Sequence, residues 1–126
     1  MTGRKGMHQP KRVDKPWGHE LIWAHSDRYV GKLLHINKDQ RLSLQYHQRK
    51  DETIHVRTGT LLLVVDEGAG LVEKTLRPGE SYHIRPLTKH RMVGLTDCEV
   101  LEVSTPELDD VVRLEDAYGR AGTTAP

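Results

Sequence analysis

Short runs of β-type residues, separated by turn-forming residues, dominate this 126-residue sequence, and helical periodicity is weak. Nine of these runs are expected to be strands: Leu21–Ala24, Val30–Ile36, Arg41–His47, Thr53–Thr58, Leu61–Asp66, Leu71–Leu76, Ser81–Arg85, His90–Gly94 and Glu99–Ser104. Turn residues separate them, as at Glu67–Gly70 and Arg77–Gly79. Strands of this length at roughly even spacing are typical of an all-β sandwich or barrel. We therefore predict an all-β fold.

The chain length permits one domain with a modest core. Residues 1–12 are polar and contain two glycines and a proline, so we expect a flexible basic arm there. Residues 13–120 are expected to form the barrel domain, and residues 121–126 a flexible tail. Near the end of the domain, Leu108–Glu115 is expected to be a short helical or irregular segment.

Charge and cysteine content exclude several classes of protein. The net charge of +1 divides into +4 on residues 1–15 and −3 on the rest, so the slightly acidic body argues against nucleic acid as a partner. Cys98 is the only cysteine, which fits a reducing compartment and a core position. The longest apolar run, Leu61–Val65, is too short for a bilayer. The N-terminus also lacks a signal-peptide pattern, and we expect a cytoplasmic protein with no membrane partner.

Alternation along the third run separates two faces. Leu42, Leu44 and Tyr46 point one way, whereas Ser43, Gln45 and His47 point the other. A strand with one apolar face and one face of metal-capable groups suits a barrel with a site at its mouth. Gln45 and His47, two residues apart, can reach the same ion.

Two blocks of sequence have a characteristic spacing. The first runs Gln45-x-His47-x4-Glu52-x6-Gly59, and the second runs Gly79-x10-His90. This arrangement resembles the two-part signature of the cupin superfamily, with Gln45 in the place of the first histidine. The resemblance implies a single-domain cupin, which is a double-stranded β-helix or jelly-roll barrel.

Three positions depart from the cupin signature. Asp39 and Leu87 stand where the signature has glycine, and Arg85 stands where it has proline. Glycine and proline set backbone geometry, so these departures bear on turns more than on metal ligation.

A closer resemblance is to the cupin domain of type II mannose-6-phosphate isomerases, which is usually fused behind a sugar-nucleotide transferase. The motifs that carry it are Lys15-Pro16-Trp17-Gly18, Arg41-Leu42-Ser43-Leu44-Gln45-Tyr46-His47 and Tyr118-Gly119-Arg120. They extend over residues 15–120. That family uses glutamine as the first metal ligand, so Gln45 matches the family pattern.

The resemblance implies that Gln45, His47, Glu52 and His90 bind one divalent metal ion. Two imidazoles, a carboxylate and an amide oxygen form a mixed site that leaves room for substrate oxygens. We expect zinc first, with manganese, iron, cobalt or nickel as alternatives.

Other residues are assigned roles around the metal. His55 is the reserve for proton transfer, and Arg120 is expected to act with it at the catalytic centre. Lys15, Arg41, Arg91 and Arg120 are expected to bind the substrate, because a guanidinium matches phosphate or carboxylate oxygens in pairs.

The predicted function is aldose–ketose isomerisation of a sugar or sugar phosphate. A cupin fold alone does not choose a reaction. The alternatives are a metal-dependent oxygenase or lyase acting on a small organic acid, and a sugar-binding barrel without catalysis. The resemblance also implies a homodimer.

Overall fold

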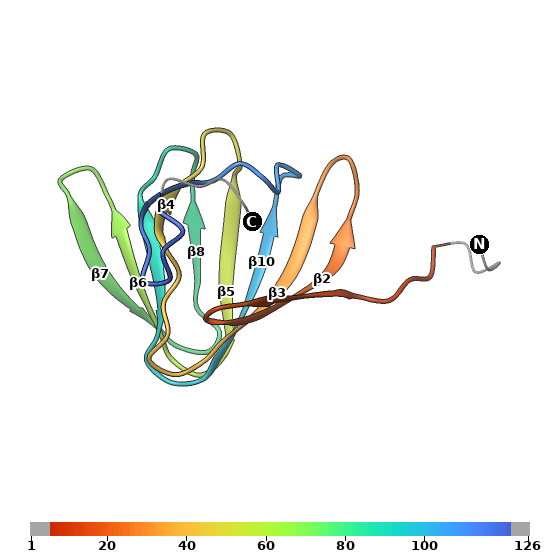
Figure 1. Cartoon of the computed structure of the whole chain (residues 1–126), viewed down its shortest axis with the longest axis horizontal. Coiled ribbons are helices and arrows are strands. Elements are labelled where there is room, and N and C mark those ends of the chain that lie inside the picture. Colours follow the sequence, from red (N-terminus) through yellow and green to blue (C-terminus); the bar gives the residue numbers. More distant parts are fainter. Residues whose placement is uncertain (1–5, 122–126) are drawn as a thin grey trace.

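The computed structural model describes residues 6–121, and this range contains eleven β-strands and no helix (Figure 1). The strands are β1 (Lys11–Lys15), β2 (Gly18–His25), β3 (Val30–Ile36), β4 (Leu44–Tyr46), β5 (Glu52–Thr58), β6 (Leu61–Asp66), β7 (Leu71–Leu76), β8 (Ser81–Ile84), β9 (His90–Gly94), β10 (Cys98–Ser104) and β11 (Val112–Glu115). The predicted all-β class is confirmed.

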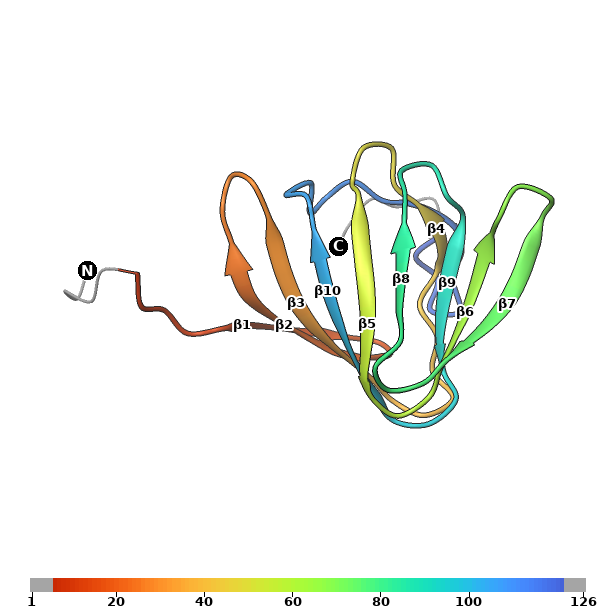
Figure 2. The same ribbon diagram turned by 180° about the vertical axis from the view of Figure 1, so that it is seen from behind.

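Two antiparallel sheets make up the domain. The six-stranded sheet has the order β1-β2-β3-β10-β5-β8, and the five-stranded sheet has the order β11-β4-β9-β6-β7. The sheets converge at one end and open at the other, as the views from both sides show (Figures 1 and 2). The chain crosses repeatedly between the sheets, so residues distant in sequence line the space between them.

None of the described elements is a helix long and apolar enough to cross a membrane.

The core lies between the sheets and is built mainly from aliphatic side chains, in a chain that has no phenylalanine. Strand β6 shows how the sequence directs this packing. Leu61, Leu63 and Val65 are fully buried, whereas Leu62 and Val64 between them face outward. Cys98 is also in the core, where burial raises the pKa of its thiol to about 11.

The two ends of the domain differ from the prediction. Strand β1 begins at Lys11, inside the segment expected to be a flexible arm, and pairs with β2 along its whole length. The expectation of a helical segment at Leu108–Glu115 is wrong, because Val112–Glu115 is a strand. Its residues pair with β4, with Arg113 opposite Gln45. Val111 and Arg113 are buried and Leu114 is exposed, which is the two-residue period of a strand.

Two positions that depart from the cupin signature keep a left-handed backbone. Asp39 has a φ of 66° and Leu87 a φ of 67°, which is the region that favours glycine. Gly59, by contrast, is required by space as well as by its φ of 78°. A Cβ atom there would lie 2.2 Å from the carbonyl oxygen of Asp97. The turns of the signature are therefore retained while two of their glycines are not.

Candidate metal centre

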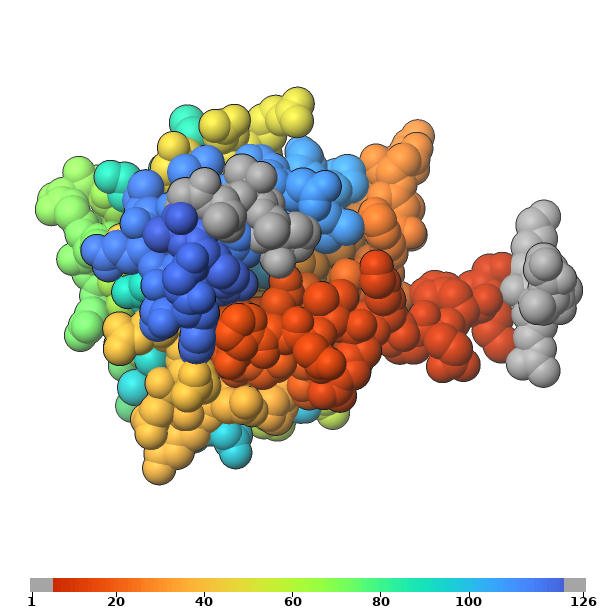
Figure 3. Space-filling model, in the orientation of Figure 1, coloured from red at the N-terminus to blue at the C-terminus, as the bar shows by residue number. Residues whose placement is uncertain are grey.

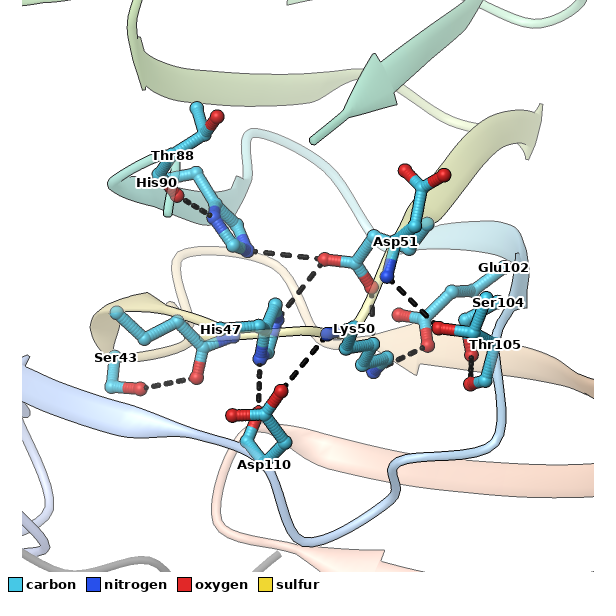
Figure 4. A network of polar contacts seen from close by, with 12 residues as sticks. Ser43, His47, Lys50, Asp51, Thr88, His90, Glu102, Ser104, Thr105 and Asp110 are labelled. Atoms are coloured by element: carbon cyan, nitrogen blue, oxygen red, sulfur yellow. Dashed lines mark hydrogen bonds and ion pairs between the residues drawn. The ribbon is translucent and has the colours of Figure 1, made fainter. Parts of the chain in front are cut away.

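Three predicted ligands meet between the sheets. His47 directly follows β4, Glu52 begins β5 and His90 begins β9, and all three side chains are buried. The Oε1 atom of Glu52 lies 3.2 Å from the Nε2 atom of His47 and 3.2 Å from the Nε2 atom of His90. Figure 4 shows the two labelled rings on the same side of this network. One nitrogen or oxygen from each residue lies within 4.8 Å of the others.

The outer nitrogen of each imidazole is held by a backbone carbonyl. His47 Nδ1 donates to the oxygen of Asp110 at 2.5 Å, and His90 Nδ1 donates to the oxygen of Thr88 at 2.8 Å. A neutral imidazole that donates from Nδ1 presents a lone pair at Nε2. Both Nε2 lone pairs are therefore directed towards the Glu52 carboxylate.

This arrangement fits a divalent cation. Two nitrogen acceptors and an ionised carboxylate face one another, and His90 Nε2 has no hydrogen-bond partner among residues 6–121 although it is fully buried. Buried polar atoms are normally satisfied, and an orphan of this kind calls for an ion or water. Imidazole nitrogens and a carboxylate oxygen, with each imidazole fixed by its second nitrogen, are the donors and supporting contacts of protein metal sites.

Gln45 lies beside these three residues. It is opposite His90 in the β4–β9 register and lines the same cavity. Its Oε1 atom accepts a hydrogen bond from the Ser43 hydroxyl at 2.9 Å. A carbonyl oxygen has two lone pairs, so that bond leaves one for a metal. The role of Gln45 as fourth ligand stays a prediction.

A buried lysine sits behind the centre. Lys50 Nζ lies 3.4 Å from Glu52 Oε2 and 3.1 Å from Glu102 Oε2. Burial alone would lower the pKa of Lys50, but the charges of Glu102 and Glu52 outweigh it and raise the pKa. Burial likewise opposes ionisation of Glu52, and the Lys50 charge holds the pKa of Glu52 well below its usual range. For Glu102, burial and the neighbouring charge of Glu52 raise the pKa.

Charged side chains line the wall of the cavity in front of the centre, and the basic ones outnumber the acidic ones. The apolar side chains of Trp17, Leu42 and Met92 also line it, and Lys32 is paired with Glu20. The basic side chains other than Lys50 are Lys15, Lys32, Arg113 and Arg120. Burial lowers the pKa of Lys15, and the charges of Lys32, Arg120 and Arg113 add to that effect while Glu20 opposes it. The positive charges are therefore close enough to repel one another.

Arg120 is held in this wall by its own turn. Asp116 accepts hydrogen bonds from Arg120 Nε at 3.0 Å, from Nη2 at 3.1 Å and from the backbone N–H at 2.6 Å. Gly119, with a φ of 79°, allows the chain to turn back. Tyr118 ties the same segment to the barrel by donating to Gln40 Oε1 at 2.6 Å. Figure 3 shows this C-terminal segment in blue against the N-terminal segment in red.

The sequence profile of the family described as "Mannose-6-phosphate isomerase C-terminal" matches residues 2–116. The chain belongs to this family. A curated relative is the mannose-1-phosphate guanylyltransferase ManC of Salmonella typhimurium, 33% identical over 123 residues, which are 94% of this chain and 25% of that protein. This chain thus spans about a quarter of the length of the curated relatives that it matches.

Solved structures agree on the fold of the domain. The structure of KdgF from a Halomonas species superposes with a TM-score of 0.68 at 23% identity, covering 79% of this chain and 88% of that one. A cupin from Silicibacter pomeroyi, described as a sugar phosphate isomerase, superposes with a TM-score of 0.63 at 25% identity, covering 75% of this chain and 64% of that one. The predicted cupin fold is confirmed.

Three predicted site residues lie away from the cavity. Arg91 follows His90 on β9, so alternation turns it outward, where its Nε donates to the oxygen of Leu42 at 2.9 Å. Arg41 and Arg91 line a hollow on the outer face of the five-stranded sheet. His55 also points outward from β5 and contacts the Ser81 hydroxyl at 2.7 Å. These placements remove His55, Arg41 and Arg91 from the site that we propose, whereas Lys15 and Arg120 remain in it.

Several residues of this family member's cavity escaped sequence reasoning. They are charged groups at positions that face the core: Glu20, Lys32, Glu102 and Arg113. A signal was present in two of the strands. Lys32 has the same parity as the buried Leu34 and Ile36, and Glu102 has the same parity as Val100 and Cys98. A charge at an inward-facing strand position is costly unless it is paired, and it marks a polar cavity.

Proposed function

We propose that this chain is a metal-dependent cupin that interconverts an aldose and a ketose, with a phosphorylated sugar as substrate. The observation that carries this proposal is that a group of metal-capable side chains and a group of basic side chains share one cavity. His47 and Glu52, whose acceptor atoms converge with that of His90, line this cavity, and the basic group of Lys15, Lys32, Arg113 and Arg120 lines the same space. A cation site and an anion site in one cavity suit a substrate with a reactive carbonyl and a phosphate.

His47, Glu52 and His90 would hold the metal, with Gln45 as a fourth ligand. When bound, a divalent ion there would polarise a substrate oxygen and so acidify the adjacent C–H bond. The fixed Nδ1 contacts of both imidazoles keep their Nε2 atoms directed inward, so little reorganisation is needed on binding.

The basic wall would orient the substrate. Arg120 is already directed into the cavity by its contacts with Asp116, so little side-chain entropy is lost when it meets an anion. Guanidinium groups pair with phosphate oxygens in a planar, bidentate way. The buried Trp17, Leu42 and Met92 would exclude water from the remaining wall.

The reaction also needs a base inside the cavity, because a proton must leave C2 and return to C1. With His55 outside, the carboxylates that line the cavity beyond Glu52 are Glu20 and Glu102. We propose that one of these two carries the proton. Replacing each by glutamine keeps its size and removes its basicity, so one of Glu20→Gln and Glu102→Gln should abolish turnover without loss of bound metal.

The test is a turnover assay on metal-stripped and reloaded protein. The conversion of a phosphorylated aldose to the ketose is monitored by NMR and should require added zinc or manganese. His90→Ala should lose this activity, and the matched control His55→Ala should keep it. If the reloaded protein binds sugar phosphates and shows no interconversion, the chain is a binding barrel instead of an isomerase.

One observation favours a second candidate. Two histidines and a carboxylate are also the facial triad of non-haem iron oxygenases, so an oxygenase or lyase acting on a small organic acid would use the same centre and the same basic wall. Oxygen uptake by the iron-loaded protein with a small acid would identify an oxygenase, and cleavage of the acid without oxygen would identify a lyase. Sugar-phosphate interconversion by the zinc-loaded protein under nitrogen, with no reaction of small acids, would exclude both.

A further inference from the structure

Asp110, from a distant part of the chain, binds the turn that runs from His47 to Glu52. It lies in the segment between β10 and β11, about sixty residues from its partners in sequence. Its backbone carbonyl accepts the hydrogen bond from His47 Nδ1 at 2.5 Å. Figure 4 shows Asp110 directly beside the ring of His47, on the side away from His90.

The carboxylate of the same residue binds the backbone of the turn. It accepts hydrogen bonds from the N–H groups of Gln48, Arg49 and Lys50 at 2.9, 2.7 and 2.9 Å. Three successive N–H groups that converge on one anion form a compact nest, and charge-assisted bonds of this kind are stronger than neutral ones. The turn that carries His47 at one end and Glu52 at the other is therefore fixed at its centre.

The two parts of Asp110 act on different properties of the centre. The carbonyl contact orients the His47 ring and favours the tautomer with its proton on Nδ1. The carboxylate contacts fix the path of the chain over residues 48–50, and so the separation of His47 from Glu52. Lys50, whose N–H is in the nest, also contacts Glu52 through its side chain.

We infer that Asp110 is a positioning residue of the metal centre, which sets metal affinity by holding the His47 tautomer and the His47–Glu52 turn. The inference rests on the proposed metal site. A residue that only tied two loops together would change the stability of the fold and leave the metal affinity of folded protein unchanged.

The experiment measures Co²⁺ affinity of the full chain by competition with a chelator. Asp110→Ala keeps the backbone carbonyl but removes the three carboxylate contacts that hold residue 110, and with it that carbonyl, against the turn. Because both contacts are then loosened, the variant should bind Co²⁺ about 10- to 100-fold more weakly than the wild type. Asp109→Ala is the matched control, because Asp109 is exposed and contributes its backbone carbonyl to a neighbouring turn. It should stay within twofold of the wild type. A folded Asp110→Ala protein with wild-type Co²⁺ affinity would overturn the inference.

If Asp110→Ala does not fold, the same Co²⁺ measurement is made on Asp110→Asn. The amide of Asn keeps one oxygen acceptor and lacks the negative charge. Unchanged Co²⁺ affinity in that variant would also overturn the inference. Imidazole ¹⁵N spectra of metal-free protein give a second readout. His47 should be a single Nδ1-protonated tautomer in the wild type and a mixture in the variant.

The two readouts separate the inference from the proposed function. If the wild type binds no Co²⁺, the metal site itself fails, and the positioning role is then judged on the His47 tautomer alone. An identical tautomer in the wild type and the variant would then contradict that role.

Discussion

The Nε2 atom of His90 lies 3.2 Å from the Oε1 atom of Glu52, while the other nitrogen of the same ring donates to the oxygen of Thr88. Two acceptors at this distance in a buried place repel each other unless a proton or a metal ion lies between them. The second histidine, His47, makes the same approach to the same oxygen. Because one carboxylate oxygen faces two nitrogens, a single cation bound there would account for both contacts.

Lys50 should be essential for stability. Replacing it with methionine leaves the buried Glu52 and Glu102 without their shared counter-charge, and removing one partner of a buried ion pair costs about 3–5 kcal/mol. Urea unfolding of metal-free protein measures this loss. The double variant Lys50→Met, Glu102→Gln removes one of the two stranded charges and should recover part of it. Lys89→Met, at an exposed position, is the control. If Lys50→Met lowers the free energy of unfolding no more than the control does, Lys50 does not stabilise the fold by neutralising Glu52 and Glu102.

Arg120 should discriminate phosphorylated from neutral sugars. Lysine keeps the charge and loses the planar fork, so Arg120→Lys should bind a sugar phosphate about tenfold more weakly and retain its metal. Arg91→Lys is the matched control, because Arg91 faces the outside of the five-stranded sheet. Calorimetric titration of one sugar, with and without its phosphate, into all three proteins provides the comparison. Equal affinities for both ligands in every protein would rule out an anion site at Arg120.

The features that the sequence could predict are those that depend on local pattern. Strand β6 was predicted over Leu61–Asp66 because its alternation is regular and strongly apolar. The approach of His47, Glu52 and His90 was predicted because these residues match the cupin ligand spacing. These signals lie within short stretches of sequence and need no knowledge of the packing between distant segments.

The features that escaped prediction depend on tertiary contacts. Strand β1 has one apolar residue, Val13, and is extended because β2 supplies its partners. Strand β11 is too short to show a clear period and is defined by its pairing with β4. Lys32 and Arg113 belong to different sheets, so only the closed fold brings them into one cavity. The outward direction of His55 follows from alternation from Glu52, which faces the centre.

Leu87 should be a site of stored backbone strain. A leucine with a φ of 67° in the left-handed region is destabilised by about 1–2 kcal/mol relative to glycine, and the side chain is 67% exposed, so little packing is lost on replacement. Leu87→Gly should therefore raise the free energy of unfolding by about 0.5–1 kcal/mol. Leu95→Gly, at an exposed leucine without a positive φ, should lower it. Destabilisation in both variants, measured by urea unfolding, would contradict this account of the turn.

Asp116 should make stability depend on pH in the acid range. Burial tends to raise its pKa, but the hydrogen bonds and charge of Arg120 outweigh that tendency and lower it from the usual 3.8. Its stabilising effect is therefore complete above about pH 5 and is lost as the pH falls below 3.8 through the folded-state pKa. Melting temperatures of the wild type and Asp116→Asn should differ at neutral pH and converge in acid. A difference that stays constant down to pH 2 would show that the Asp116 carboxylate is not held by Arg120.

The most direct measurement is an anomalous diffraction map of crystals grown with zinc and recorded at the zinc edge. The proposed centre predicts one strong peak bound by His47 Nε2, His90 Nε2 and a Glu52 oxygen at about 2.0–2.2 Å, with the Gln45 oxygen as a fourth ligand. The peak should be absent in His90→Ala crystals grown in the same way. A zinc peak elsewhere on the chain, or none between the three residues at saturating zinc, would contradict the metal centre on which this account depends.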